Sequence, residues 1–337
     1  MDQLQCALAG EGFLVFDGAM GTMLQRHIAA STDPAELLCL TNPQVITDIH
    51  HAYAEAGSQV ATTNTFGANA MKLEGAATVA EVFAAAVKCA RDSGVSYVAA
   101  DIGPSGELLF PMGDFTFSEA YDLFAEQARA AQAAGADLVI VETMADLLEM
   151  VAAVVAVKES CSLPVVATMT FTESGRTYMG ASPKTAALVL SALGVDALGV
   201  NCSVGPDNLQ PVVNEMLEVA ACPVIVQANA GLPQVVDGKT VYTLPPDEYA
   251  AAIRPMVEAG ATIIGGCCGT DPDYIREIVK MLEGCTPNSE PLEKGSMLEI
   301  AREVADEGGR DEDILCEILD ASDFEELKEA LRDEYDE

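Results

Sequence analysis

The chain has 337 residues, and half of them are hydrophobic, which is ample apolar material for a large folded core. With 53 acidic residues against 17 Lys and Arg, the formal net charge of -36 argues against binding to nucleic acid or to anionic membrane surfaces. No apolar run approaches the roughly 20 residues that span a bilayer. The N-terminus also lacks the basic start and apolar stretch of a secretion signal. We therefore expect a globular cytoplasmic protein whose ten cysteines are mostly reduced.

Short runs of β-branched and apolar residues alternate with Ala-rich helical stretches through residue 285. Runs that are apolar almost throughout suit strands buried on both faces, as in a parallel sheet. The predicted strands are Phe13–Asp17, Gln59–Thr65, Val95–Ile102, Ala136–Glu142, Pro164–Thr170, Val195–Cys202, Pro223–Asn229 and Ala261–Cys267. Glycines mark the expected ends of four intervening helices, where a left-handed residue is needed: Gly57, Gly135, Gly194 and Gly260.

Eight strands, each followed by a helix, predict an α/β protein with a (β/α)8 TIM barrel. An open doubly wound sheet is the alternative. It is less favoured because no Gly-x-Gly-x-x-Gly turn follows the first predicted strand. We expect the barrel to occupy residues 1–286.

Residues 287–337 are expected to form a short helical acidic extension. Positions 292–337 hold 18 acidic residues against five Lys and Arg. Apolar residues recur there at helical spacing, which predicts three short amphipathic helices. Ser296, Asp311 and Ser322 are the expected N-caps. Packing of these helices on the barrel or on each other is favoured over docking to a partner.

The carboxyl ends of the sixth and eighth predicted strands carry three cysteines, Cys202, Cys267 and Cys268. In a closed barrel one strand separates these two, so the thiols can converge at the face where barrel enzymes place their active sites. Three thiolates with a fourth position open suit a catalytic Zn²⁺. Glycines around the vicinal pair (Gly265, Gly266, Gly269) are expected to let the backbone turn tightly. Buried apolar cysteines, or a strained Cys267–Cys268 disulfide, are the alternatives.

Two acidic residues end buried strands, Asp17 after the first and Glu142 after the fourth. A buried carboxylate needs a partner, and a substrate ammonium would serve. The alternative is that such an acid caps the following helix. The histidines (His27, His50 and His51) have no metal-ligand spacing, and we expect them at solvated helix positions.

At these strand ends the chain resembles the homocysteine S-methyltransferase family. The motifs are Asp17–Thr22 (DGAMGT), Thr63–Gly67 (TNTFG), Asp101–Pro104 (DIGP), Glu142-Thr143, Asn201–Ser203 (NCS), Asn229–Gly231 (NAG) and Gly265–Thr270 (GGCCGT). Within the family they look most like the homocysteine-binding module of cobalamin-dependent methionine synthase. The resemblance implies zinc on Cys202, Cys267 and Cys268, and the amino-acid end of homocysteine held by Asp17 and Glu142. Gly18, Thr63 and Asn64 are expected to line the same pocket.

The resemblance implies methyl transfer to the sulfur of homocysteine, giving methionine. In that synthase the barrel is followed by folate and corrinoid modules, so here we expect a separate methyl-corrinoid protein as donor. The alternatives are an S-methylmethionine- or betaine-type donor, or a thiol or corrinoid methyltransferase of a demethylation pathway. A non-catalytic zinc-binding regulatory subunit is the alternative from a different class.

Overall fold

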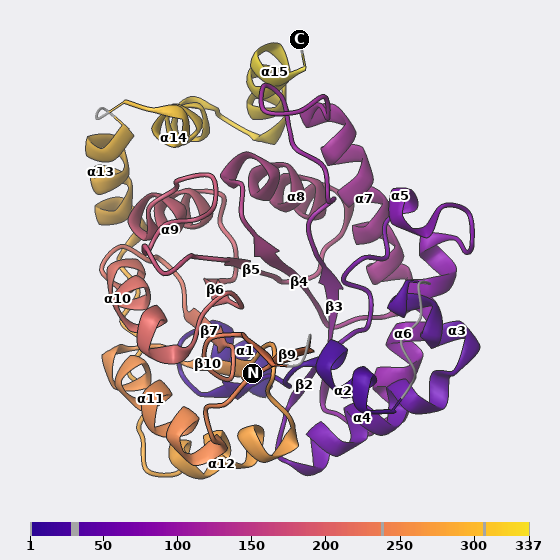
Figure 1. Cartoon of the computed structure of the whole chain (residues 1–337). Coiled ribbons are helices and arrows are strands. Elements are labelled where there is room, and N and C mark those ends of the chain that lie inside the picture. The colour runs from indigo at the N-terminus through magenta and orange to yellow at the C-terminus, as the bar shows by residue number, and fades with distance from the viewer. Residues whose placement is uncertain (1, 28–33, 237–238, 306–307, 337) are drawn as a thin grey trace.

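The computed structural model describes residues 2–27, 34–236, 239–305 and 308–336. Eight parallel strands lie side by side around a central axis, with helices outside them (Figure 1). Their order around the sheet is β1, β10, β7, β6, β5, β4, β3, β2. Their bounds are β1 Leu14–Val15, β2 Val60–Thr62, β3 Tyr97–Ile102, β4 Leu138–Met144, β5 Val165–Met169, β6 Ala197–Asn201, β7 Val224–Ala228 and β10 Ile263–Gly266. All eight fall within the predicted runs or overlap them.

The ring closes between its first and second strands. Phe16 and Val60 form a parallel bridge. The backbone N–H of Gln59 donates to the carbonyl of Val15 at 2.8 Å, and the Val15 N–H donates to Gln59 Oε1 at 2.8 Å. The predicted barrel is therefore confirmed.

Helices connect successive strands and cover the outside of the barrel (Figure 1). Gly57, Gly135, Gly194 and Gly260 all have positive φ, as predicted for residues that end helices. The helices are α1 Gln3–Leu8, α2 Met20–His27, η1 Ala35–Leu37, α3 Leu38–Thr41, α4 Pro43–Glu55, α5 Ala70–Leu73, α6 Val79–Asp92, α7 Phe117–Ala134, α8 Leu147–Ser160, α9 Pro183–Ala192, α10 Pro206–Leu217, α11 Pro246–Ala259, α12 Pro272–Leu282, α13 Lys294–Ala305, α14 Arg310–Asp320 and α15 Phe324–Tyr335. Among the described helices, none is both long and apolar enough to cross a membrane.

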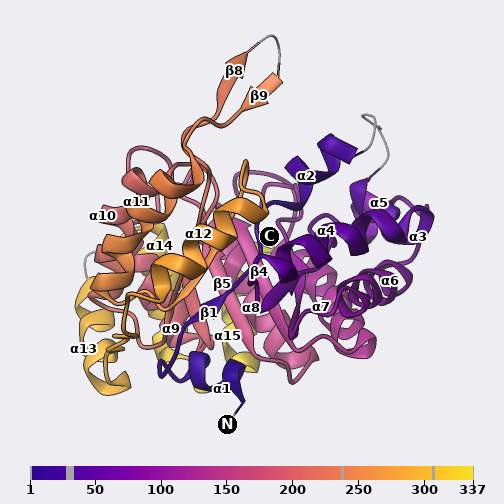
Figure 2. The same ribbon diagram turned by 90° about the horizontal axis from the view of Figure 1, so that it is seen from below.

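The barrel interior is apolar at one end and polar at the other. Buried side chains from the strands and from α1 form one apolar cluster, which includes Leu4, Ala99, Ile140 and Ile225. Figure 2 shows α1 beneath the barrel, so this helix closes the amino ends of the strands. Side chains two residues apart in a strand share a face. Two or four residues further along five of the strands, the inward positions at the carboxyl ends are polar: Asp101, Glu142, Thr168, Asn201 and Gln227.

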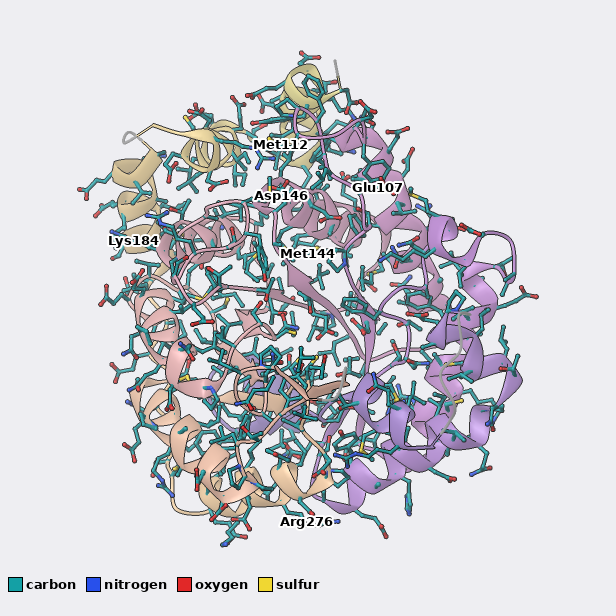
Figure 3. The ribbon with its side chains drawn as sticks, viewed as in Figure 1. Glu107, Met112, Met144, Asp146, Lys184 and Arg276 are labelled. Atoms are coloured by element: carbon teal, nitrogen blue, oxygen red, sulfur yellow. The ribbon has the colours of Figure 1, made fainter. Side chains whose placement is uncertain are left out.

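The end of β4 lies near the centre of the molecule, well inside the outer helices (Figure 3). Figure 3 shows Met144 close to the centre and Lys184 and Arg276 at the outer edge. Met144 pairs in register with Met169 of β5, and both side chains are fully buried. Both side chains therefore serve as core packing near the strand ends.

Residues after α12 form the three helices predicted from the apolar spacing, shown in yellow in Figure 1. They pack outside α7, α8 and α9, as expected for helices that cover the barrel. Lys328 of α15 forms an ion pair with Glu159 of α8 at 2.8 Å.

The predicted N-caps of these helices are wrong. Ser296 lies inside α13, and Asp311 lies inside α14, whose N-cap is Gly309. Asp323, one residue after Ser322, caps α15. The error has a simple cause, because several acidic and hydroxyl residues near each helix start could serve as caps and packing selects among them.

An antiparallel hairpin that the sequence reading did not predict lies between β7 and α11. Its strands are β8 Gln234–Val236 and β9 Lys239–Val241. Figure 2 shows it projecting from the end of the barrel opposite α1. Its base is fixed at the barrel, since the N–H of Leu244 donates to the carbonyl of Ala230 at 3.2 Å.

Candidate functional site

Three cysteine sulfurs meet at the carboxyl end of the barrel. Cys202 follows β6, and Cys267 and Cys268 follow β10, with β7 between these strands. Their Sγ atoms all lie within 4.8 Å of one another, and Cys202 Sγ is 3.8 Å from Cys268 Sγ. All three residues are partly exposed and none of the three is in a disulfide, so neither alternative for the trio holds.

The sulfur spacing fits tetrahedral zinc. A Zn–S bond of about 2.3 Å places two sulfurs of a tetrahedral site about 3.8 Å apart. The Cys202–Cys268 distance matches that edge. Hydrogen bonds from Cys202 and Cys267 lower the pKa of the Cys268 thiol, and hydrogen bonding to Cys202 and Cys268 raises that of Cys267. The three thiol groups therefore interact as one cluster, and their spacing suits a single Zn²⁺.

Local backbone geometry turns the cysteines toward each other. Cys202 and Ser203 both have left-handed backbones, with φ of 61° and 57°. The Cys202 N–H donates to the carbonyl of Gln227 at 3.0 Å, which fixes this turn to β7. Non-glycine residues hold such a conformation only when the surrounding structure enforces it, and such positions cluster at functional sites.

The glycines beside the vicinal cysteines act differently from the prediction. Gly265 and Gly266 belong to β10 and have no positive φ; they are needed because neighbouring atoms approach too closely for a side chain. Gly269 alone of the three turns the chain, with φ of +84°. A Cβ on Gly269 would lie 2.3 Å from Cγ of Tyr242, so this aromatic ring lies directly on the glycine.

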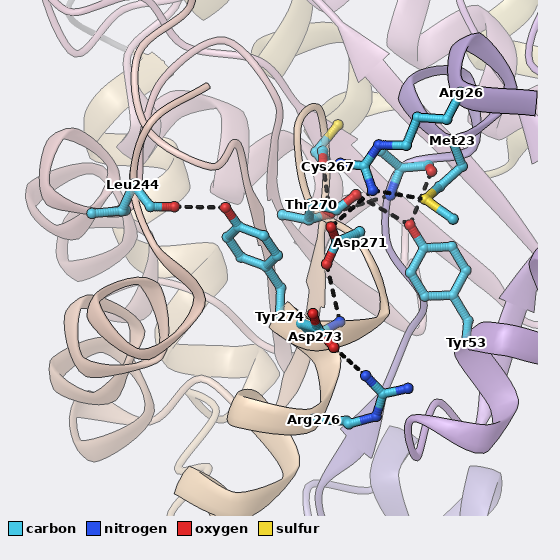
Figure 4. Close-up of polar contacts among 11 residues, drawn as sticks. Met23, Arg26, Tyr53, Leu244, Cys267, Thr270, Asp271, Asp273, Tyr274 and Arg276 are labelled. Atoms are coloured by element: carbon cyan, nitrogen blue, oxygen red, sulfur yellow. Dashed lines mark hydrogen bonds and ion pairs between the residues drawn. The ribbon is translucent and has the colours of Figure 1, made fainter. Parts of the chain in front are cut away.

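The cysteine loop is braced by residues from the start of the chain (Figure 4). The Tyr53 hydroxyl donates to the carbonyls of Ala19 at 2.9 Å and Thr270 at 3.2 Å. Arg26 of α2 forms an ion pair with Asp271 at 2.9 Å. The loops after β1 and β10 are therefore tied together.

Gly18, expected in the substrate pocket, has a packing role in this brace. A Cβ there would lie 2.6 Å from Thr270 Oγ1 and 2.9 Å from the Tyr53 ring. A side chain at this position would therefore push the two loops apart.

Asp17 is buried at the mouth, with 3% exposure. Its Oδ2 accepts a hydrogen bond from the Thr62 N–H at 2.9 Å, so the carboxylate is tied to β2 and does not cap α2. His50 Nδ1 lies 3.7 Å from the same oxygen. The expectation that His50 is solvated is wrong, because its side chain is fully buried. His51 is exposed as expected, and the side chain of His27 lies outside the described part of the chain.

Glu142 faces the same mouth and is held by a polar network. Asn201 Nδ2 donates to Glu142 Oε2 at 3.4 Å and to Thr143 Oγ1 at 2.6 Å. Thr168 Oγ1 donates to Asn201 Oδ1 at 2.9 Å, which fixes the amide. Burial and the charges of Asp17 and Cys268 raise the pKa of Glu142 to about 8.

Asp101 is an acidic residue of the mouth that the sequence reading did not select. It is 4% exposed, and its Oδ1 has no hydrogen-bond partner in the described structure. Burial, then the charge of Glu142, raises its pKa well above the usual value. Its position two residues after inward-facing Ala99 was the signal that could have identified it.

The expected pocket residues of the second strand bond mainly to the protein. Thr63 Oγ1 contacts Thr65 Oγ1 at 2.7 Å and accepts from the Asp101 N–H at 3.0 Å. Asn64 Nδ2 donates to the carbonyl of Ala35 at 2.8 Å. These contacts fix the loop after β2, and a substrate contact for Thr63 and Asn64 stays a prediction.

Tyr242 is a second residue that the sequence reading missed. It follows β9 and lies on Gly269, and its side chain hydrogen-bonds to Cys268. Burial, followed by the charge of Cys268, raises the pKa of Tyr242, so the hydroxyl keeps its proton. No sequence spacing indicates this contact, because it depends on where the segment after β9 rejoins the barrel.

Fold and site together define a (β/α)8 barrel protein with three convergent thiols beside buried carboxylates at its carboxyl mouth. A sequence profile described as homocysteine S-methyltransferase matches residues 14–282. The chain belongs to this family.

Named relatives are much longer than this chain. Methionine synthase of Mycobacterium leprae is 34% identical over 301 residues, and the match covers 82% of this chain and 25% of that protein. Methionine synthase of Mycobacterium tuberculosis is 35% identical over 289 residues, covering 79% of this chain and 24% of the relative. The chain thus spans about a quarter of the length of these relatives.

Two solved structures of another protein have a fold similar to that of this chain. The oxidized form of the homocysteine methyltransferase MmuM from Escherichia coli superposes with a TM-score of 0.71, at 22% identity, over 83% of this chain and 99% of that one. Its metallated form gives a TM-score of 0.69 at 23% identity, over 82% of this chain and 99% of that one. At this identity the likeness shows the fold alone.

Proposed function

We propose that this barrel catalyses transfer of a methyl group to the sulfur of homocysteine, giving methionine, with Cys202, Cys267 and Cys268 as ligands of a zinc ion. The observation that carries the proposal is the meeting of three sulfurs within 4.8 Å at the barrel mouth. Their partial exposure leaves one side of the trio accessible to an incoming thiol. When bound there, zinc would take the substrate sulfur as a fourth ligand and lower the pKa of its thiol.

The protein's own sulfurs favour a reactive acceptor. Three cysteine thiolates contribute three negative charges, which exceeds the charge of one divalent cation. An electron-rich environment of this kind keeps the substrate sulfur nucleophilic even while its proton is removed. The thiol proton is released to solvent, and the electron pair of the sulfur forms the new S–CH₃ bond. The methyl group is transferred as CH₃⁺, so the electron pair of its former bond stays with the donor.

The carboxylates of the mouth suit the ammonium of an amino-acid thiol. Asp17 and Asp101 are buried there and Glu142 is half-buried, and the pKa of Asp101 is raised by burial and then by the charges of other acids, first of all Glu142. A bound cation would relieve this repulsion. We assign the ammonium of homocysteine to Asp17 and Glu142, and the network through Asn201 orients Glu142 toward it.

A methyl-corrinoid carried by a protein is the proposed donor. Support comes from the relatives named methionine synthase, of which this chain matches about a quarter. The site lies at an open barrel end, where a carrier could present its methyl group.

The test is an assay of methionine formation by the zinc-loaded chain with four separate donors: methylcobalamin, S-methylmethionine, betaine and S-adenosylmethionine. Activity with methylcobalamin and with none of the other three donors supports the donor assignment. Activity only with S-methylmethionine, betaine or S-adenosylmethionine contradicts it while preserving the acceptor chemistry.

The metal ligands need a separate variant. Cys202→Ser should lose both bound zinc and turnover, measured by metal analysis and by the same assay. Cys6→Ser is the matched control, because Cys6 lies in α1 at the opposite end of the barrel. Full activity without zinc in Cys202→Ser would remove the metal from the mechanism.

A further inference from the structure

His50 is a buried histidine whose ring lacks a hydrogen bond. Its side chain lies on α4 with 0% exposure. Neither Nδ1 nor Nε2 has a hydrogen-bond partner among the described residues. An unpaired polar group in the interior costs free energy that an apolar residue of similar size would avoid. The presence of histidine at this buried position therefore calls for a role in its interaction with neighbouring residues.

The nearest charged contact of the ring is the carboxylate of Asp17. His50 Nδ1 lies 3.7 Å from Asp17 Oδ2, which is longer than a hydrogen bond. The same oxygen accepts the Thr62 N–H at 2.9 Å. Both contacts use Oδ2, so Oδ1 is left for a ligand at the barrel mouth.

We infer that His50 is a positioning residue for Asp17, an inference that rests on the proposed function. In this role the Nδ1–H of His50 donates a hydrogen bond to Asp17 Oδ2 when the substrate ammonium binds Oδ1. Bonds of this kind are often long without substrate and shorten in the complex. One donor from Thr62 leaves the carboxylate free to rotate about its Cβ–Cγ bond, whereas a second donor from another direction fixes its plane.

The helix that carries His50 is suited to this role. Tyr53 lies three residues further along α4, on the same face of the helix. Its hydroxyl binds the loops after β1 and β10 through the carbonyls of Ala19 and Thr270. One rigid face of α4 therefore supports both the loop that follows Asp17 and the loop that carries the vicinal cysteines.

Two variants and two thiols test the inference. His50→Leu removes the donor and keeps a buried apolar side chain, whereas His50→Asn keeps an N–H near the position of Nδ1. The substrates are homocysteine and 4-mercaptobutanoate, which has the same thiol and carboxylate but no ammonium. Dissociation constants by calorimetry and kcat/KM are measured for both thiols with the zinc-loaded chain.

His50→Leu should weaken homocysteine binding about tenfold, as for loss of one hydrogen bond to a charged group, and raise KM more than it lowers kcat. Binding of 4-mercaptobutanoate should not change. His50→Asn should recover most of the homocysteine affinity. This selective loss is what a merely structural histidine would not produce.

Three results would overturn the inference. An equal loss for both thiols would make His50 a packing residue, and unchanged homocysteine binding in His50→Leu would remove any role at Asp17. Wild-type chain that binds the two thiols equally well would show that no ammonium is recognised. That third result refutes the proposed substrate as well, which distinguishes it from the first two.

Discussion

Gly269→Ala probes how the cysteine loop is held, because this glycine lies between Cys268 and the loop's brace at Thr270. Its φ of +84° disfavours alanine by about 1–2 kcal/mol. The new Cβ would also lie 2.3 Å from Tyr242 Cγ, whereas ordinary contacts begin at 3.4 Å. The ring or the loop must therefore move by about 1 Å, a displacement that can cost about 100-fold in rate at an active site.

Gly75→Ala is the matched control. Gly75 has a φ of +77°, close to that of Gly269, but no atom lies within 4 Å of its Cβ position. Both variants should lose about 1 kcal/mol of unfolding free energy from backbone strain. Only Gly269→Ala should also lose zinc affinity and about 100-fold in kcat/KM.

The measurements are urea unfolding, zinc content and methionine formation. In the double variant Gly269→Ala/Tyr242→Ala, the collision is relieved, so zinc affinity should return in part. Gly269→Ala that keeps full zinc and activity would refute the reasoning, since it would show that the position of the cysteine loop does not depend on this contact.

Three further changes have defined outcomes. Glu142→Gln should raise KM for homocysteine more than tenfold. The pKa of Glu142 is about 8, so its carboxylate becomes charged as pH rises from 6 to 9, and the wild-type KM should fall over this range. The variant should lose this pH dependence. Tyr53→Phe removes two hydrogen bonds to backbone carbonyls and should lower the unfolding free energy by about 1–2 kcal/mol in urea titrations. Arg310→Leu breaks the two-bond ion pair to Asp146, at 3.1 Å for each bond, and should cost about 2 kcal/mol in urea titrations while kcat/KM stays unchanged.

Local sequence was sufficient for the strands and for most helix ends. Buried strands are apolar along their length, and a left-handed residue that ends a helix favours glycine, so these features depend on near neighbours. The vicinal cysteines were likewise recognisable, because a strand end in a parallel barrel has a known place. The predicted N-caps of the last three helices were wrong, because several adjacent residues could each make the capping hydrogen bond and the local sequence does not choose among them.

Contacts between segments far apart in the sequence could not be predicted from local sequence patterns. His50 lies beside Asp17, and Tyr242 lies on Gly269, because helix α4 and the β8–β9 hairpin fold against particular strand ends. Arg310 meets Asp146 across 164 positions of the chain.

The amino-acid sequence by itself determined the barrel, its family and the three thiols at its mouth. Tertiary structure decided the sulfur distances, the burial of His50 and the placement of Tyr242 on Gly269. The physical reason is that hydrophobic periodicity and the residue types at strand ends are set by residues adjacent in the sequence. A distance between two side chains depends instead on how whole helices and strands pack.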